Sequence, residues 1–191
     1  MPKAPQRTFQ SLRGHFLLDG GTLGGSCFHR SVVLVCEHTP EGALGLVLTR
    51  PGSLRLEESL PGEVPQGFHG TPLFDGGPVQ PTALSYLHST PAHLLGNVLS
   101  GLSIGHQIVD LHELMASGPP KLRLKVFAGY AGWSPGQLDG ELRRGSWLTA
   151  PAEVAAVFDI PPEDLWRHLI RRRESWQERL LADAPEDLAS N

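Results

Sequence analysis

The chain has 191 residues, a formal net charge of −4 and only two cysteines. This length is typical of one domain with a full hydrophobic core, and we expect residues 1–191 to form a single domain. The acidic balance argues against a nucleic-acid surface that covers the whole domain, and two cysteines are too few for a disulfide scaffold. The sequence contains no apolar run of membrane-spanning length and no signal-peptide core. We therefore expect a cytoplasmic protein without a membrane segment.

The first predicted elements are three short apolar strands, near His15–Leu18, Val32–His38 and Ala43–Thr49, and the last two are rich in Val and Leu. The Gly-rich connection Asp19–Gly25 separates the first two strands. It has neither P-loop nor dinucleotide-binding spacing, and a strand rather than a helix follows it. This pattern favours a structural loop over a phosphate cradle.

The second strand contains the residue types of a thiol nucleophile. Side chains alternate along a strand, so Cys36 and His38 are predicted to share one face. A Cys–His pair is the raw material of nucleophilic catalysis. The alternative is that Cys36 is a small core residue, as free cysteines commonly are.

The middle of the chain predicts a sharp connection at 75–79, which contains Gly76 and Gly77, followed by a strand at 83–88. A helix is predicted to begin at Asp110. The alternating segment 121–126 predicts a strand with one solvated side, and the residues expected to face outward are Lys121, Arg123 and Lys125. This basic row could contact phosphate, or it could be a charged surface that discourages aggregation.

A Gly-rich turn at 129–137 then leads from this strand into a helix. Gly129 and Gly132 allow close backbone approach and flank Tyr130. Ser134 is the predicted N-cap, with Gln137 three residues later. Two interpretations stay open: a ligand or anion site at the helix start, or a packing corner filled by Trp133.

The C-terminal part predicts a long helix over 162–182, in which the run Arg171–Arg173 could suggest nucleic-acid binding. Acidic residues on the same segment favour a salt-bridged, solvated face instead. We expect residues 1–7 and 183–191 to be flexible.

Three blocks of this sequence resemble the YqgE/AlgH family of small bacterial proteins. They are FHRSVVLVCEHTPEGALGLVLTRP at 28–51, FDGGPVQP at 74–81 and VFAGYAGWSPGQLDGEL at 126–142. The resemblance implies an α+β fold, a single compact domain with a mixed, partly barrel-like β-sheet flanked by helices. Most members are uncharacterised, and one is described as a transcriptional regulator, so the resemblance implies a regulatory role. The sequence contains no helix-turn-helix pattern.

These observations favour a non-catalytic binding or regulatory domain that recognises a small molecule or a protein, with no cofactor and no metal. Direct nucleic-acid binding is a further, less favoured option. The alternative is a hydrolytic or thiol-dependent enzyme that uses Cys36 and His38 or a carboxylate such as Glu37 or Asp139. The candidate binding residues are Glu37, His38, Gly76, Gly77, Gly129, Tyr130, Gly132, Trp133, Ser134 and Gln137.

Overall fold

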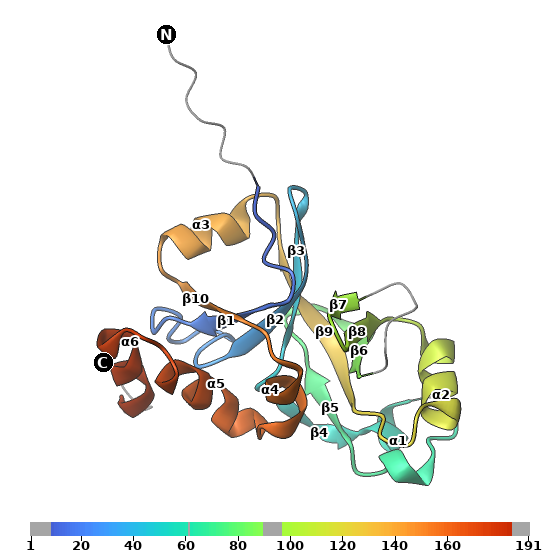
Figure 1. Ribbon diagram of the computed structural model, residues 1–191. Helices are drawn as coiled ribbons and strands as arrows, with labels where there is room; N and C mark the ends of the chain where they lie inside the picture. The colour runs from blue at the N-terminus through green and yellow to red at the C-terminus, as the bar shows by residue number, and fades with distance from the viewer. Residues whose placement is uncertain (1–8, 61, 90–96, 185–191) are drawn as a thin grey trace.

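The computed structural model describes residues 9–60, 62–89 and 97–184, and Figure 1 shows their arrangement. The predictions of flexibility for residues 1–7 and for residues 185–191 lie outside the described residues. Of the predicted flexible stretch 183–191, the structure describes residues 183 and 184, and Asp183 ends the 3₁₀ turn η2 (Leu181–Asp183). Among the described residues, no helix is long and apolar enough to span a membrane.

Ten strands form one curled, mostly antiparallel sheet. They are β1 (His15–Asp19), β2 (Val32–Thr39), β3 (Gly42–Val47), β4 (Pro51–Arg55), β5 (Pro72–Asp75), β6 (Val79–His88), β7 (Asn97–Leu99), β8 (Leu102–Gly105), β9 (Leu124–Trp133) and β10 (Trp147–Pro151). The main order is β10-β1-β2-β3-β9-β6-β8-β7, and β5 joins β4 to β9. The predicted α+β fold with a partly barrel-like sheet is therefore confirmed.

Strand β9 holds the two halves of the sheet together. Its first half pairs with β6 and, in parallel, with β5, whereas Ala131–Trp133 pairs with β3. Gly129 lies between these two halves with φ of +73°, a left-handed conformation that favours glycine. The strand therefore changes partners at a point where its backbone is irregular.

Six α-helices lie in the described chain: α1 (Leu56–Ser59), α2 (Ile108–Ser117), α3 (Gln137–Arg143), α4 (Val154–Asp159), α5 (Pro162–Arg171) and α6 (Trp176–Leu180). A short 3₁₀ turn, η1, covers Gln66–Phe68. The predicted continuous helix over 162–182 is wrong. It is interrupted after Arg171, and Ser175 caps α6 by accepting a hydrogen bond from the Glu178 amide. Trp176 and Leu180 of α6 are 61% and 56% exposed.

Helices cover different parts of the sheet and create three apolar clusters. The main cluster lies between the sheet and helices α4 and α5. The second cluster lies on the opposite side of β1–β3, where Leu138 of α3 packs against it. The third is formed by α1 and α2 with β6 and β9 (Figure 1). Much of the sheet is consequently buried on both faces, with no solvated side.

Two local predictions are wrong, one about the exposure of a lysine and one about the start of a helix. Lys125, expected to face solvent, is only 8% exposed, because β9 is a central strand covered on both sides. Its Nζ lies 4.4 Å from the centre of the Phe74 ring. The helix predicted to begin at Asp110 begins at Ile108, with Gln107 as the N-cap residue.

Candidate functional site

A β-bulge in β2 decides which side chains meet at the candidate site. Val35 pairs with Gly45 and Glu37 pairs with Leu44, so Cys36 is an extra residue between them. Directly paired residues share a face of the sheet. Glu37 therefore lies on the side of Leu44, which packs against the main cluster, and His38 lies on the other side with Ala43. The prediction that Cys36 and His38 share a face is wrong.

Cys36 is a core residue rather than an accessible nucleophile. It is fully buried in the main cluster, and its Sγ lies 3.6 Å from the Leu34 carbonyl oxygen. Burial raises the pKa of the Cys36 thiol far above its usual range, and the neighbouring charge of Glu37 adds to this effect. The thiol is therefore neutral at physiological pH, and the geometry does not support thiol catalysis.

His38 secures the segment that precedes β1. Its Nδ1 accepts a hydrogen bond from the Leu12 amide at 3.1 Å, and its carbonyl oxygen accepts one from Ser11 Oγ at 2.8 Å. The ring of Phe9 meets the imidazole edge-on, with centres 4.8 Å apart. Burial lowers the pKa of His38, whereas the charge of Asp139 raises it. The contacts of His38 are therefore made on the face of β2 opposite to Glu37.

An open groove of about 520 Å³ lies over the neighbouring ends of β2, β3 and β9. Its lining residues are Glu37, Thr39, Glu41, Gly42, Ala43, Leu44, Val79, Tyr130, Gly132, Trp133 and Ser134. The pairing places Glu37, Leu44 and Gly132 in one row across the three strands. Tyr130 and Val79 lie beside Gly132, since a Cβ there would be 3.3 Å from Tyr130 Cε2 and 3.5 Å from Val79 Cγ2.

The groove collects five of the ten predicted binding residues: Glu37, Tyr130, Gly132, Trp133 and Ser134. The predicted residues Gly76, Gly77 and Gly129 are not among the lining residues, and they lie close to neighbouring backbone. A Cβ at Gly76 would overlap the Gly129 carbonyl oxygen, and one at Gly77 would overlap the Tyr130 backbone. These glycines therefore permit two chain segments to approach closely and do not line the groove.

The indole of Trp133 fills a packing corner. It is 7% exposed in the second cluster, and its Nε1 donates to Glu141 Oε2 at 2.8 Å. Trp147 Nε1 donates to the same oxygen at 2.8 Å. Glu141 was not singled out from the sequence, although it lies on α3 one turn after Gln137. The packing alternative therefore describes the indole, although Trp133 also borders the groove.

The start of α3 is built differently from the predicted cap. The N-cap residue is Gly136, with φ of +71°, and no side chain caps the helix. Ser134 belongs to the groove, and its amide donates to Gln137 Oε1 at 3.0 Å. Gln137 Nε2 donates to Glu141 Oε1 at 3.1 Å. Gln137 is therefore engaged with its own helix and lies outside the groove.

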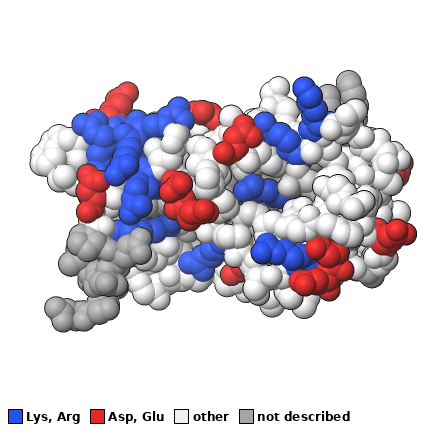
Figure 2. Space-filling model, turned by 90° about the horizontal axis from the view of Figure 1, so that it is seen from below, with Lys and Arg blue, Asp and Glu red and all other residues white. Residues whose placement is uncertain are grey.

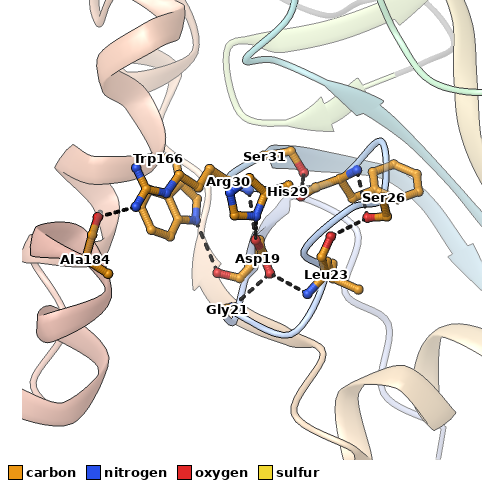
Figure 3. A network of polar contacts seen from close by, with 10 residues as sticks. Asp19, Gly21, Leu23, Ser26, His29, Arg30, Ser31, Trp166 and Ala184 are labelled. Atoms are coloured by element: carbon orange, nitrogen blue, oxygen red, sulfur yellow. Dashed lines mark hydrogen bonds and ion pairs between the residues drawn. The ribbon is translucent and has the colours of Figure 1, made fainter. Parts of the chain in front are cut away.

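A second polar centre surrounds the Gly-rich loop (Figure 3). The fully buried Asp19 carboxylate accepts hydrogen bonds from the amides of Gly21, Leu23 and Arg30, at 2.8, 3.3 and 2.8 Å. Trp166 Nε1 donates to the Asp19 carbonyl oxygen at 3.2 Å. The loop amides that could have bound an anion are thus used by a carboxylate of the same chain. The geometry agrees with the structural-loop interpretation.

The same centre fixes Arg30 in a left-handed conformation, with φ of +49°. The Arg30 guanidinium stacks 5.3 Å from the centre of the Trp166 ring and donates to the Ala184 carbonyl (Figure 3). His29 Nδ1 lies 3.5 Å from Asp19 Oδ2. These contacts join the loop to α5 and to the C-terminal turn.

The three consecutive arginines at the end of α5 and just after it are ion-paired. Arg171 pairs with Asp183, Arg172 with Glu153 and Arg173 with Glu178, at 3.1, 2.7 and 2.7 Å. On the face drawn in Figure 2, basic side chains gather at the left and acidic side chains lie around them. The three arginines are thus salt-bridged as predicted, but only Arg173 pairs with a carboxylate of the segment 162–182. Among the described residues, no three His, Cys, Asp or Glu side chains gather closely enough to hold a metal.

Sequence reasoning missed six groove residues: Thr39, Glu41, Gly42, Ala43, Leu44 and Val79. The first five surround the turn between β2 and β3, so the turn itself carried the usable signal. Val79 could not be found in this way, because it reaches the groove through its pairing with Tyr130.

Comparisons with known proteins match this sequence and fold over most of their length. A family model described as DUF179, AlgH-like, matches residues 16–176. A UPF0301 protein of Chlorobium luteolum is 37% identical over 178 residues, covering 91% of each chain. One from Streptomyces avermitilis is 35% identical over 191 residues, covering 95% of this chain and 96% of the relative.

Two solved structures share the fold. The AlgH protein of Pseudomonas aeruginosa superposes with a TM-score of 0.74 at 31% identity, covering 94% of this chain and 98% of that one. Protein DIP2367 of Corynebacterium diphtheriae superposes with a TM-score of 0.71 at 24% identity, covering 93% and 94%. The chain therefore belongs to the uncharacterised AlgH-like (UPF0301) family.

Proposed function

We propose that this chain is a non-catalytic, cytoplasmic binding domain whose groove receives a small molecule or a segment of a protein partner. The observation that carries this proposal is the open groove over β2, β3 and β9, in which Glu37, Tyr130 and Ser134 meet. Its volume lies in the range of ligand sites, and its lining combines apolar residues with charged and hydroxyl side chains.

Backbone irregularities support the same interpretation. The bulge at Cys36 directs Glu37 toward the groove, and the left-handed Gly129 lies one residue before Tyr130. Gln80, next to the groove residue Val79, has φ of +45°. Bulges and strained backbone are enriched beside functional sites.

The regulatory part of the proposal is that ligand occupancy of the groove changes how the domain contacts a partner. Direct nucleic-acid binding receives no support from the run Arg171–Arg173, because each of these arginines is paired with a carboxylate. A carboxylate-based hydrolase also lacks support. Glu37 faces the groove, whereas the charge of Asp139 acts on His38 at the other face.

Amide NMR spectra recorded against a fragment library of mixed charge test the proposal. We expect shifts that concentrate at Leu44, Gly132 and Ser134. Gly132→Val should abolish them, because its side chain would occupy the space beside Tyr130 and Val79. Gly67→Val is the matched control, since a Cβ there meets nothing within 4 Å. A library that produces no shifts in the groove would refute the proposal.

A further inference from the structure

The groove has a one-sided chemistry. Its charged lining side chains are the carboxylates of Glu37 and Glu41, and its remaining polar side chains are the hydroxyls of Thr39, Tyr130 and Ser134. In the part of the chain that the structure describes, no Lys, Arg or His lines it. Neither carboxylate forms an ion pair or hydrogen bond with another described residue.

Four other carboxylates around the sheet are occupied. Asp19 accepts three amides, Glu141 accepts two indoles and an amide, and Glu153 and Glu178 pair with arginines. Glu37 and Glu41 instead place two like charges at one groove, and a bound cation would relieve their repulsion. We propose that the groove binds a ligand carrying an alkylammonium or guanidinium group, an inference that rests on the binding function proposed above.

The arrangement of the walls suits a cation on an aliphatic stem. Glu37 stands at one end of the row, Leu44 and Gly132 form the apolar floor, and Tyr130 and Val79 stand at the other end. The stem packs on the floor while the cationic head reaches the carboxylates. The Tyr130 ring offers a cation–π surface to a second positive group.

The test compares two five-carbon probes of opposite charge, cadaverine and glutarate, by amide NMR at low salt. We expect cadaverine to shift Leu44, Gly132 and Ser134, and glutarate to leave them unchanged. The acetylated and amidated tripeptide Ala-Lys-Ala is the second arm. Stronger binding of the tripeptide identifies a lysine side chain of a partner protein as the source of the cation, and stronger binding of cadaverine identifies a small amine.

The carboxylates are tested by the double variant Glu37→Gln/Glu41→Gln. We expect cadaverine to bind about tenfold more weakly, because two charge partners are lost. Glu63→Gln/Glu113→Gln removes the same charge from two exposed residues outside the groove and should bind cadaverine like the wild type. Raising the salt concentration should weaken only the binding that involves the carboxylates.

The outcomes separate this inference from the proposed function. If glutarate or neutral fragments shift the groove amides and Glu37→Gln/Glu41→Gln binds cadaverine unchanged, the cation inference is overturned and the groove remains a binding site. If no probe of any charge shifts these amides, the proposed function fails as well. Equal weakening of cadaverine binding by both double variants would also overturn the inference, because it would reflect net charge alone.

Discussion

The Asp19 loop and the groove at Glu37 are both acidic, but the chain treats their carboxylates differently. Asp19 is fully buried, and three backbone amides of its own loop surround it. Glu37 and Glu41 line an open groove without a described partner. The first carboxylate is already saturated by the fold, whereas the other two retain their capacity to bind something else.

This difference separates structural polar groups from candidate binding groups. Both segments contain motifs that could suggest chemistry, a Gly-rich loop in one and the residues Cys36–His38 in the other. Only the satisfaction of each polar group distinguishes them, because a buried polar group without a partner costs free energy, whereas an exposed one costs little.

The largest effect should come from removing the buried carboxylate. Asp19→Ala leaves three loop amides without their acceptor, and we expect a loss of about 3 kcal/mol in the free energy of unfolding. Chemical denaturation measures it. Asp19→Asn, which keeps one acceptor oxygen, should lose less. A loss below about 1 kcal/mol for Asp19→Ala would show that water replaces the carboxylate.

Lys125 provides the opposite case, a buried charge that forms no ion pair with another described residue. Burial lowers the pKa of Lys125 to about 8, and the charge of Glu163 partly opposes this. Lys125→Met should stabilise the protein by about 1–2 kcal/mol at pH 7, because the variant buries no charge.

The pH dependence follows from the sign of that shift. Below pH 8, Lys125 is charged in both states and its burial cost is complete. Between pH 8 and about 10.5, the unfolded chain binds the extra proton, so the stability of the wild type rises with pH. The advantage of Lys125→Met should therefore shrink between pH 7 and pH 9.5. A constant advantage would place the effect in packing instead of charge.

His38 should show a smaller, acid-dependent effect. The lowered pKa means that the unfolded chain binds a proton more readily, so stability is complete above about pH 6.5 and falls as the pH decreases. Protonated Nδ1 cannot accept the Leu12 amide, which should cost about 1 kcal/mol. Hydrogen exchange of the Leu12 amide, measured from pH 7 to 5, reports this opening.

His38→Asn is the control for this measurement, because its amide oxygen can still accept the Leu12 hydrogen bond and does not titrate. Its exchange at Leu12 should lose the acid-dependent opening. If His38→Asn and the wild type open identically at pH 5, another group controls the segment.

The smallest effect should come from the groove. Glu37→Gln/Glu41→Gln should change the free energy of unfolding by less than about 0.5 kcal/mol, because neither carboxylate has a described partner to lose. Urea denaturation of this variant beside Asp19→Ala makes the comparison direct. A loss of 2 kcal/mol would mean that these carboxylates are structural, and the contrast between the two regions would disappear.

The arrangement of the core was predictable from local patterns. Short apolar runs marked β1, β2 and β3. These signals depend on neighbouring residues, which a single sequence displays directly. The glycines at 76, 77 and 129 were also recognised as special, although their close approach to one another was not.

The composition of the site was less predictable because it depends on pairing. The extra residue at Cys36 reversed the faces of Glu37 and His38. The alternation of residues in Val32–His38 contains no signal that predicts this bulge. Lys125 was predicted to face solvent because its segment alternates between apolar and basic residues. Its burial depends instead on elements that are distant in the sequence. His38 is bound by residues 26 and 27 positions away.

The position of β9 has a consequence for synthesis on the ribosome. β3 and β6 both pair along β9, which lies at Leu124–Trp133, about two-thirds of the way along the chain. Until this segment leaves the exit tunnel, the nascent chain carries two hydrophobic strand edges that lack their common neighbour. Chains that stop before Leu124 should therefore aggregate. The two halves of the sheet should assemble only after the central strand β9 has been synthesised.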